Sequence, residues 1–119
     1  MSNESWRPKL HLSAHNGSVS DPNGLNQFRG TYHFFSQYAP TYPPHADSPH
    51  GWGHFTRRDL VHWAFLGCHI MPDCPSDRDG SYSGGACING DELWLYYTGN
   101  VRDGKGDGTH SGRLANQTL

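Results

Sequence analysis

The chain of 119 residues is long enough for one small domain, and its hydrophobic fraction of 34% is too low for a large core. A formal net charge of −2, without a basic run, argues against nucleic acid or an anionic membrane as a partner. With no long apolar run, no recognisable secretory leader and an odd number of cysteines (three), we expect reduced thiols and a cytoplasmic protein.

Aromatic-rich segments punctuated by glycine and proline predict an all-β fold. In the first half, residues 1–17 are polar and irregular, 38–51 form a long loop, and 57–62 form a turn or half-turn of helix. The predicted strands between them cover residues 25–28, 31–37, 52–56 and 63–66. In the strand over 31–37, Tyr32, Phe34 and Ser36 are predicted to share one face, and His33, Phe35 and Gln37 the other.

In the second half, a polar loop over 72–80 precedes strands predicted at 82–88 and 92–98, with Asn89-Gly90 as the hairpin turn. After Gly99 we expect little order unless further chain covers the segment. The segments around Gly30 and Gly90 repeat the same strand–turn–strand pattern about 60 positions apart. A repeat of this period is typical of a propeller blade, and the chain has room for about two blades, one of them incomplete.

Asp21 lies in the stretch Ser18-Val19-Ser20-Asp21-Pro22-Asn23-Gly24. Pro22 is expected to hold Asp21 in an extended conformation, and Asn23-Gly24 to form a tight turn. This would mount the carboxylate on a stiff backbone at the start of a strand. The alternative is an Asx-type turn in which Asp21 only caps its own backbone.

Short motifs follow one another along most of the chain. They are Arg7-Pro8 to Leu12, Ser18 to Gly24, Tyr32 to Gln37, Trp52 to Trp63, Tyr82 to Ala86 and Tyr97 to Asn100. Their types and order resemble the N-terminal part of glycoside hydrolase family 32, which includes invertases, sucrose-6-phosphate hydrolases, inulinases and levanases. On this resemblance, residues 1–119 form the first part, about two blades, of a catalytic five-bladed β-propeller with its active site at the mouth of the central channel.

The resemblance further implies retaining cleavage of terminal β-fructofuranosyl bonds, with Asp21 as the nucleophile that forms a fructosyl intermediate. Retention needs a second carboxyl group about 5–5.5 Å away as acid/base. The implied partner is a small-molecule or oligosaccharide fructoside, and neither a cofactor nor a metal is expected. The positions that correspond to sugar contacts are Ser20, Asn23, Gln37, Trp52, Tyr82 and Ser83. Without the family pattern, Gln37 could close a strand end, Ser83 could be a small inward residue, and Trp52 could be core.

The chain also departs from the family pattern. Ser18 and Ser20 replace a Trp and an Asn of the nucleophile motif, which keeps fructosyl transfer open as an alternative to hydrolysis. The family's Arg-Asp-Pro and Glu-Cys motifs belong to later blades, no glutamate follows Glu92, and Arg102-Asp103-Gly104 stands too close to the preceding motif to be assigned. We therefore expect these 119 residues alone to be inactive and poorly folded.

Two other classes of function remain open. A non-catalytic carbohydrate-binding pseudoenzyme fragment would keep the sugar-facing residues and lack the acid. A metal site is also conceivable, since the chain has nine histidines. Its best candidates would be Cys68, His69 and Cys74, or His50 with His54, but the chain lacks Cys-x-x-Cys pairs and the histidines are scattered.

Overall fold

The computed structural model describes residues 12–41, 50–104 and 112–119, and within these ranges all regular structure is β. The strands are β1 (Ser18–Phe28), β2 (Thr31–Ala39), β3 (Gly51–Arg57), β4 (Ala64–Ile70), β5 (Ser81–Asn89), β6 (Glu92–Arg102) and β7 (Arg113–Thr118). The described ranges contain no helix of the length and hydrophobicity that a membrane crossing requires. The all-β prediction is confirmed.

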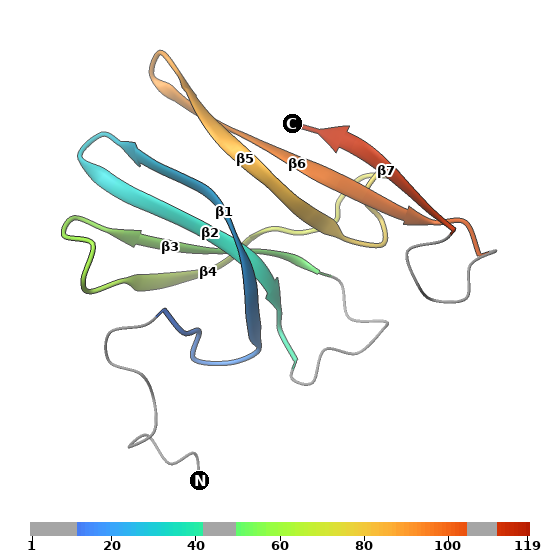
Figure 1. Ribbon diagram of the computed structural model, residues 1–119, viewed down its shortest axis with the longest axis horizontal. Helices are drawn as coiled ribbons and strands as arrows, with labels where there is room; N and C mark the ends of the chain where they lie inside the picture. Colours follow the sequence, from blue (N-terminus) through green and yellow to red (C-terminus); the bar gives the residue numbers. More distant parts are fainter. Residues whose placement is uncertain (1–11, 42–49, 105–111) are drawn as a thin grey trace, which may run out of the picture.

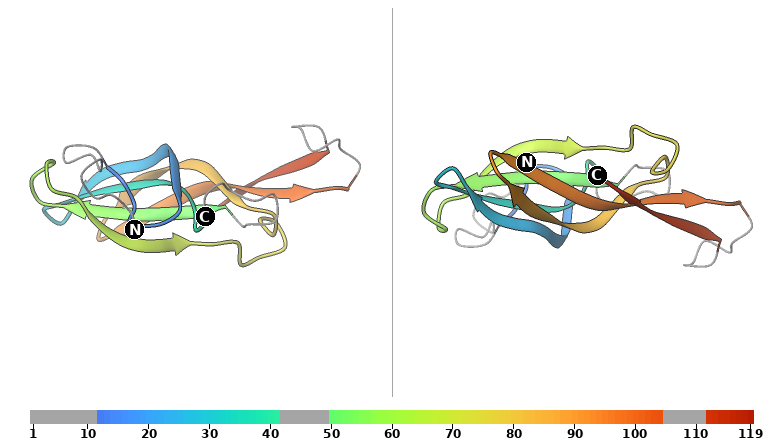
Figure 2. Two further views of the ribbon diagram at one scale, coloured as in Figure 1. Left: turned by 90° about the horizontal axis from the view of Figure 1, so that it is seen from below. Right: turned by 90° about the horizontal axis from the view of Figure 1, so that it is seen from above.

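The strands form two antiparallel sheets in which each strand pairs with the next one along the chain. The first sheet has the order β1-β2-β3-β4 and the second has the order β5-β6-β7. The sheets lie beside one another, with β1 next to β5 (Figure 1). The molecule is flat, with extents of 46 × 45 × 19 Å, and its thin edge is seen in Figure 2. One four-stranded and one three-stranded unit agree with the predicted two blades, of which one is incomplete.

The alternation predicted for β2 is confirmed. Phe35 faces the second sheet, where it forms a buried cluster with Trp52 of β3 and Tyr97 of β6. Phe34 points the other way and contacts the rings of Phe55 and Trp63. Each face of the first sheet therefore has its own small aromatic core, and the core between the sheets fixes their relative position.

The backbone around Asp21 differs from the expectation. Strand β1 already begins at Ser18, and Asp21 is not extended but has a φ of 28°. It stands in a β-bulge, because Ser20 pairs with Gln37 while Pro22 pairs with Ser36. The predicted tight turn at Asn23-Gly24 is absent: the positive φ of Gly24 (54°) accommodates a second irregularity inside the strand. A proline is tolerated in a strand at such a bulge, where no ladder hydrogen bond is needed from its nitrogen.

The prediction of little order after Gly99 is wrong for two segments. Strand β6 continues to Arg102, and residues 113–118 form β7, which pairs with β6 from Tyr97↔Thr118 to Arg102↔Arg113. Side chains add to this pairing: Gln117 Nε2 donates to the Tyr97 carbonyl of β6 (3.1 Å), and Asn116 Nδ2 connects β7 to the loop before β5 by donating to the Ser76 carbonyl (3.0 Å). The strand was missed because it is stabilised by polar contacts and lacks an alternating hydrophobic pattern.

The loop between β4 and β5 is anchored by a buried carboxylate. Asp77 is fully buried and accepts hydrogen bonds from Tyr97 Oη (2.8 Å), Cys74 N (2.9 Å), Asp73 N (3.2 Å) and Ser81 Oγ (3.4 Å). Burial alone would raise the pKa of Asp77, but these hydrogen bonds outweigh it and hold the pKa below its ordinary value. Burial and the bond to Asp77 raise the pKa of Tyr97. The network fixes Ser81, the first residue of β5.

Candidate active site

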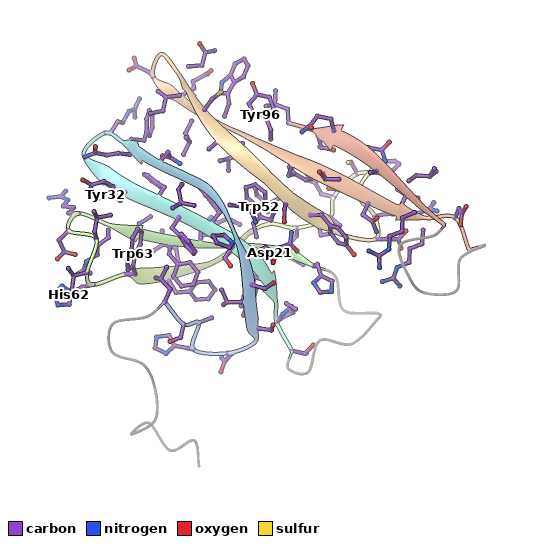
Figure 3. The ribbon with its side chains drawn as sticks, in the orientation of Figure 1. Asp21, Tyr32, Trp52, His62, Trp63 and Tyr96 are labelled. Atoms are coloured by element: carbon purple, nitrogen blue, oxygen red, sulfur yellow. The ribbon has the colours of Figure 1, made fainter. Side chains whose placement is uncertain are left out.

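The two blades meet at a carboxylate and a hydroxyl. Ser83 Oγ of β5 lies 3.4 Å from Asp21 Oδ2 of β1, and both side chains are exposed. Ser83 also occupies a bulge, because Tyr82 pairs with Thr98 while Gly84 pairs with Tyr97. Each of the two residues therefore stands outside the ladder of its own sheet. Figure 3 shows Asp21 near the centre of the molecule, where β1 passes β5.

Asn23 connects the same two segments from below the surface. It is 3% exposed, and its Nδ2 donates to the Asp21 carbonyl (2.8 Å). Its Oδ1 accepts from the Gly84 N–H of β5 (3.1 Å). Gly84 is required at this position, because a Cβ there would lie 1.9 Å from the Tyr96 carbonyl oxygen. The lack of a side chain at Gly84 thus allows β5 and β6 to approach closely next to the bulge at Ser83.

Two further predicted residues hold the start of β5 against the first sheet. Gln37 is 7% exposed and donates from Nε2 to the Ser81 carbonyl (3.0 Å). Trp52 is fully buried and donates from Nε1 to the Tyr82 carbonyl (3.0 Å). Their side chains reach the backbone of consecutive residues, so residues 81–84 are tied to the first sheet at successive points.

The predicted site residues therefore separate into two groups. Ser20, Asp21 and Ser83 are exposed, whereas Asn23, Gln37 and Trp52 are buried and bonded to neighbouring backbone. Tyr82 is half-buried. Its ring packs edge-on against His50 (centroids 6.1 Å apart), and the Arg113 guanidinium lies 5.7 Å from its centre. The structure brings all seven predicted residues into one region, and their individual roles toward a sugar stay predictions.

Gly84, Ser81, Asp77 and Tyr97 support this region and were missed as site residues. Gly84 contributes through its N–H and its lack of a side chain, and Ser81 contributes through its carbonyl. These backbone contacts cannot be predicted from the side-chain types of the two residues. The available signals were the Gly84-Gly85 pair inside a predicted strand and the aspartates of the loop over 72–80.

Two of the residues considered for a metal, His54 and Cys68, contact other side chains. His54 Nε2 lies 3.0 Å from His33 Nδ1, in a hydrogen bond between two nearly parallel rings. The Cys68 thiol contacts the sulfur of Met71 (3.1 Å). In the part of the chain that the structure describes, the one group of three possible ligands within 4.8 Å is Asp73, Cys74 and Asp77. The buried carboxylate of that group already accepts protein hydrogen bonds.

The arrangement can support nucleophilic chemistry. An exposed carboxylate held by a bulge can approach a ligand, and a neighbouring hydroxyl can orient one of its oxygens. The chain is thus a β-propeller fragment with an acidic site where the first strands of two blades meet.

The chain belongs to glycosyl hydrolase family 32, since residues 11–118 match the model described as "Glycosyl hydrolases family 32 N-terminal domain". It is 45% identical over 96 residues to a sucrose-6-phosphate hydrolase of Zymomonas mobilis, covering 81% of this chain and 18% of that protein. It is 40% identical over 116 residues to the sucrose-6-phosphate hydrolase of Salmonella typhimurium, covering 98% of this chain and 23% of that protein.

Solved structures agree with this assignment. The sucrose-6-phosphate hydrolase from Lactobacillus gasseri superposes with a TM-score of 0.82 at 37% identity, over 98% of this chain and 22% of that one. A Bombyx mori GH32 beta-fructofuranosidase gives a TM-score of 0.77 at 32% identity, over 97% of this chain and 23% of that one. The chain therefore spans about a fifth of the length of the relatives it matches.

Proposed function

We propose that the polypeptide carrying this chain cleaves terminal β-fructofuranosyl bonds with retention, and that Asp21 is its nucleophile. The observation that carries the proposal is the placement of Asp21: an exposed carboxylate on the first strand of the first blade, in a bulge that faces Ser83 of the next blade. Membership in a family of glycosidases supports the reaction class. The positive φ of Asp21 is a backbone conformation that a non-glycine residue rarely adopts, and such strain concentrates at functional sites.

In the proposed reaction, an Asp21 carboxylate oxygen attacks the anomeric carbon of the fructosyl unit. The bond from that carbon to the leaving oxygen breaks, and a protonated carboxyl group transfers its proton to this oxygen. Water then attacks the fructosyl–Asp21 ester, gives a proton back to the same carboxyl group and releases fructose. The Ser83 hydroxyl donates to Asp21 Oδ2 and so orients the carboxylate while the other oxygen attacks.

We further propose that the acid/base residue lies outside these 119 residues. No glutamate follows Glu92, and the group that contacts the Asp21 carboxylate is the Ser83 hydroxyl. Without a group that protonates the leaving oxygen, the rate falls by about 10²–10⁴-fold. The isolated 119 residues are therefore proposed to be inactive. The cytoplasmic location stays a prediction.

The substrate is proposed to be sucrose or its 6-phosphate, because the similar proteins include sucrose-6-phosphate hydrolases. A structural neighbour, a variant of the Bombyx mori enzyme, was solved in complex with sucrose. Ser20 supports fructosyl transfer as a second activity: it is exposed directly beside Asp21, where its short hydroxyl replaces the longer amide of the family motif. The ratio of fructosylated sugar to free fructose at high sucrose, compared between wild type and Ser20→Asn, would measure this activity.

The test uses the polypeptide at its full natural length with sucrose and sucrose 6-phosphate as substrates. Asp21→Asn should lower kcat on the order of 10⁴-fold, because the amide is a poor nucleophile. Asp91→Asn changes another exposed aspartate, one in the turn between β5 and β6, and should leave the rate unchanged. Proton NMR should show that the first product is the β anomer of fructose, and mass spectrometry of the quenched reaction should find the ester on Asp21. A nearly wild-type rate for Asp21→Asn would refute the assignment.

Binding without turnover is the competing outcome. If the full-length polypeptide binds fructosides in calorimetry but releases no fructose, the pseudoenzyme hypothesis replaces the enzyme. If the α anomer appears first, the enzyme is inverting and the covalent intermediate is wrong.

A further inference from the structure

We propose that Asn23 is a positioning residue that sets the approach of Asp21 to Ser83, rather than a contact to the sugar. The inference rests on the proposed role of Asp21 as nucleophile. It starts from burial: Asn23 is 3% exposed, and both ends of its amide are bonded to protein backbone. With 3% of its surface exposed, the residue presents little of this amide to a bound sugar.

The backbone groups that Asn23 holds flank the contact between the carboxylate and the hydroxyl. Its Nδ2 donates to the carbonyl of Asp21 itself, at 2.8 Å. Its Oδ1 accepts from the N–H of Gly84, the residue directly after Ser83, at 3.1 Å. One side chain therefore connects the backbone of the nucleophile to the backbone beside its hydrogen-bond donor, across two sheets.

These backbone segments need such a connection because the sheets do not provide it. Asp21 is skipped in the pairing of β1 with β2, and Ser83 is skipped in the pairing of β5 with β6. Residues in bulges lose ladder hydrogen bonds, and their orientation is set by other contacts. Across the gap between β1 and β5, Asn23 supplies a donor and an acceptor at the same time. Aspartate would lack the donor and leucine would lack both, whereas an amide has the two groups on one rigid plane.

Kinetics of the full-length polypeptide separate positioning from sugar binding. Asn23→Ala should lower kcat by about 10²-fold, as expected for a displaced reacting group, while KM changes by less than about three-fold. Asn26→Ala is the matched control. Asn26 lies on the same strand and makes the same kind of local bond, from Nδ2 to the carbonyl two residues earlier (Gly24, 2.7 Å), but its Oδ1 has no partner. This variant should keep kcat within about two-fold of wild type.

A double-mutant cycle shows whether Asn23 acts through Ser83. Ser83→Ala alone should lower kcat by about ten-fold, through loss of a hydrogen bond to a carboxylate. In the Asn23→Ala background, Ser83→Ala should lower kcat little further, because the contact between Asp21 and Ser83 is already displaced. In the Asn26→Ala background, it should lower kcat by the full factor of about ten. Additive effects of Asn23→Ala and Ser83→Ala would overturn the positioning role.

Amide hydrogen exchange tests the clamp without any activity. In Asn23→Ala the Gly84 N–H loses its acceptor and should exchange faster than in wild type, whereas Asn26→Ala should leave it unchanged. Asn23→Asp provides a second variant, because it keeps the accepting oxygen and removes the donor. In that variant Gly84 should stay protected while kcat still falls.

The outcomes are distinguishable from a failure of the proposed function. If wild type cleaves no fructoside, the proposed function fails, and the Gly84 exchange rates still decide whether Asn23 holds β5. A raised KM with unchanged kcat would instead make Asn23 a sugar contact. Unchanged Gly84 exchange in Asn23→Ala, or equal losses in Asn23→Ala and Asn26→Ala, would overturn the inference.

Discussion

Replacing Tyr97 with phenylalanine removes a single hydroxyl from the interior between the two sheets. Tyr97 is 7% exposed, and its Oη donates to Oδ2 of the fully buried Asp77 at 2.8 Å. The other oxygen of Asp77 keeps its two backbone N–H donors. Oδ2, however, keeps the longer bond from Ser81 Oγ at 3.4 Å. The variant therefore removes the shortest hydrogen bond of a buried carboxylate.

The expected cost follows from that geometry. A hydrogen bond to a charged group contributes about 1.5–3 kcal/mol, so Tyr97→Phe should lower the free energy of unfolding by about 2 kcal/mol. Tyr96→Phe is the control, because Tyr96 is half-buried and its Oη makes a long contact of 3.7 Å with the Cys87 thiol. That variant should stay within about 0.5 kcal/mol of wild type. Urea unfolding of the full-length polypeptide at pH 7 measures both.

The pH dependence provides a second check. The pKa of Asp77 is lower in the folded state than its ordinary value of 3.8, so its ionised form stabilises the fold above about pH 4. This contribution is lost as the pH falls through the folded pKa. The difference between wild type and Tyr97→Phe should therefore shrink below about pH 4. Equal stabilities of Tyr97→Phe and Tyr96→Phe at pH 7 would refute the role of the buried carboxylate.

Two further predictions concern the bulge and the histidine pair. Gly84→Ala should destabilise the protein by about 3 kcal/mol or more, because its Cβ would lie 1.9 Å from the Tyr96 carbonyl oxygen. Gly85→Ala is the control, since its Cβ enters open space and should be tolerated. Thermal unfolding compares the two variants, and equal losses of stability would contradict the clash. Burial first, and then the neighbouring histidines, lower the pKa of His54 from 6.5 to about 4. Between these two values the unfolded chain binds a proton that the folded chain does not. The free energy of unfolding should therefore decrease as the pH falls from about 6.5 to about 4. His54→Phe, which also removes the hydrogen bond to His33, should flatten this dependence in thermal unfolding between pH 7 and pH 4.5; an unchanged slope would assign it to other groups.

Most of the fold could be predicted because its signals are local. The alternation in β2 and the hairpin after β5 depend on neighbouring residues, and both are found. The two turn residues are Gly90 and Asp91, one position later than the predicted Asn89-Gly90, because Asn89 pairs with Glu92. The predicted long loop over 38–51 is shortened by the extension of β2 to Ala39, and its residues 42–49 lie outside the described part, as does the motif beginning at Arg7. Strand β7 was missed because polar side chains, rather than apolar alternation, hold it.

The candidate site was less accessible to local reasoning. Asp21 and Ser83 are 62 positions apart, and only the family resemblance placed them together. The bulge at Asp21 could not be derived from Asp-Pro-Asn-Gly, because a tight turn satisfies the same preferences. The bonds of Asn23, Gln37 and Trp52 end on backbone atoms of β5, and backbone atoms are the same in every residue. Their partners can therefore be known only from the assembled fold.

Within each sheet, every strand pairs with its neighbour in the sequence, and this has a consequence for biosynthesis. All ladders of each sheet join segments that leave the ribosome one after another, so each sheet can form while translation continues. The contacts that bring Asp21 to Ser83 span 62 positions and require both sheets. Nascent chains should thus acquire their hairpins early and the geometry of the carboxylate late, and slowing synthesis between the two sheets should delay the second event without disturbing the first.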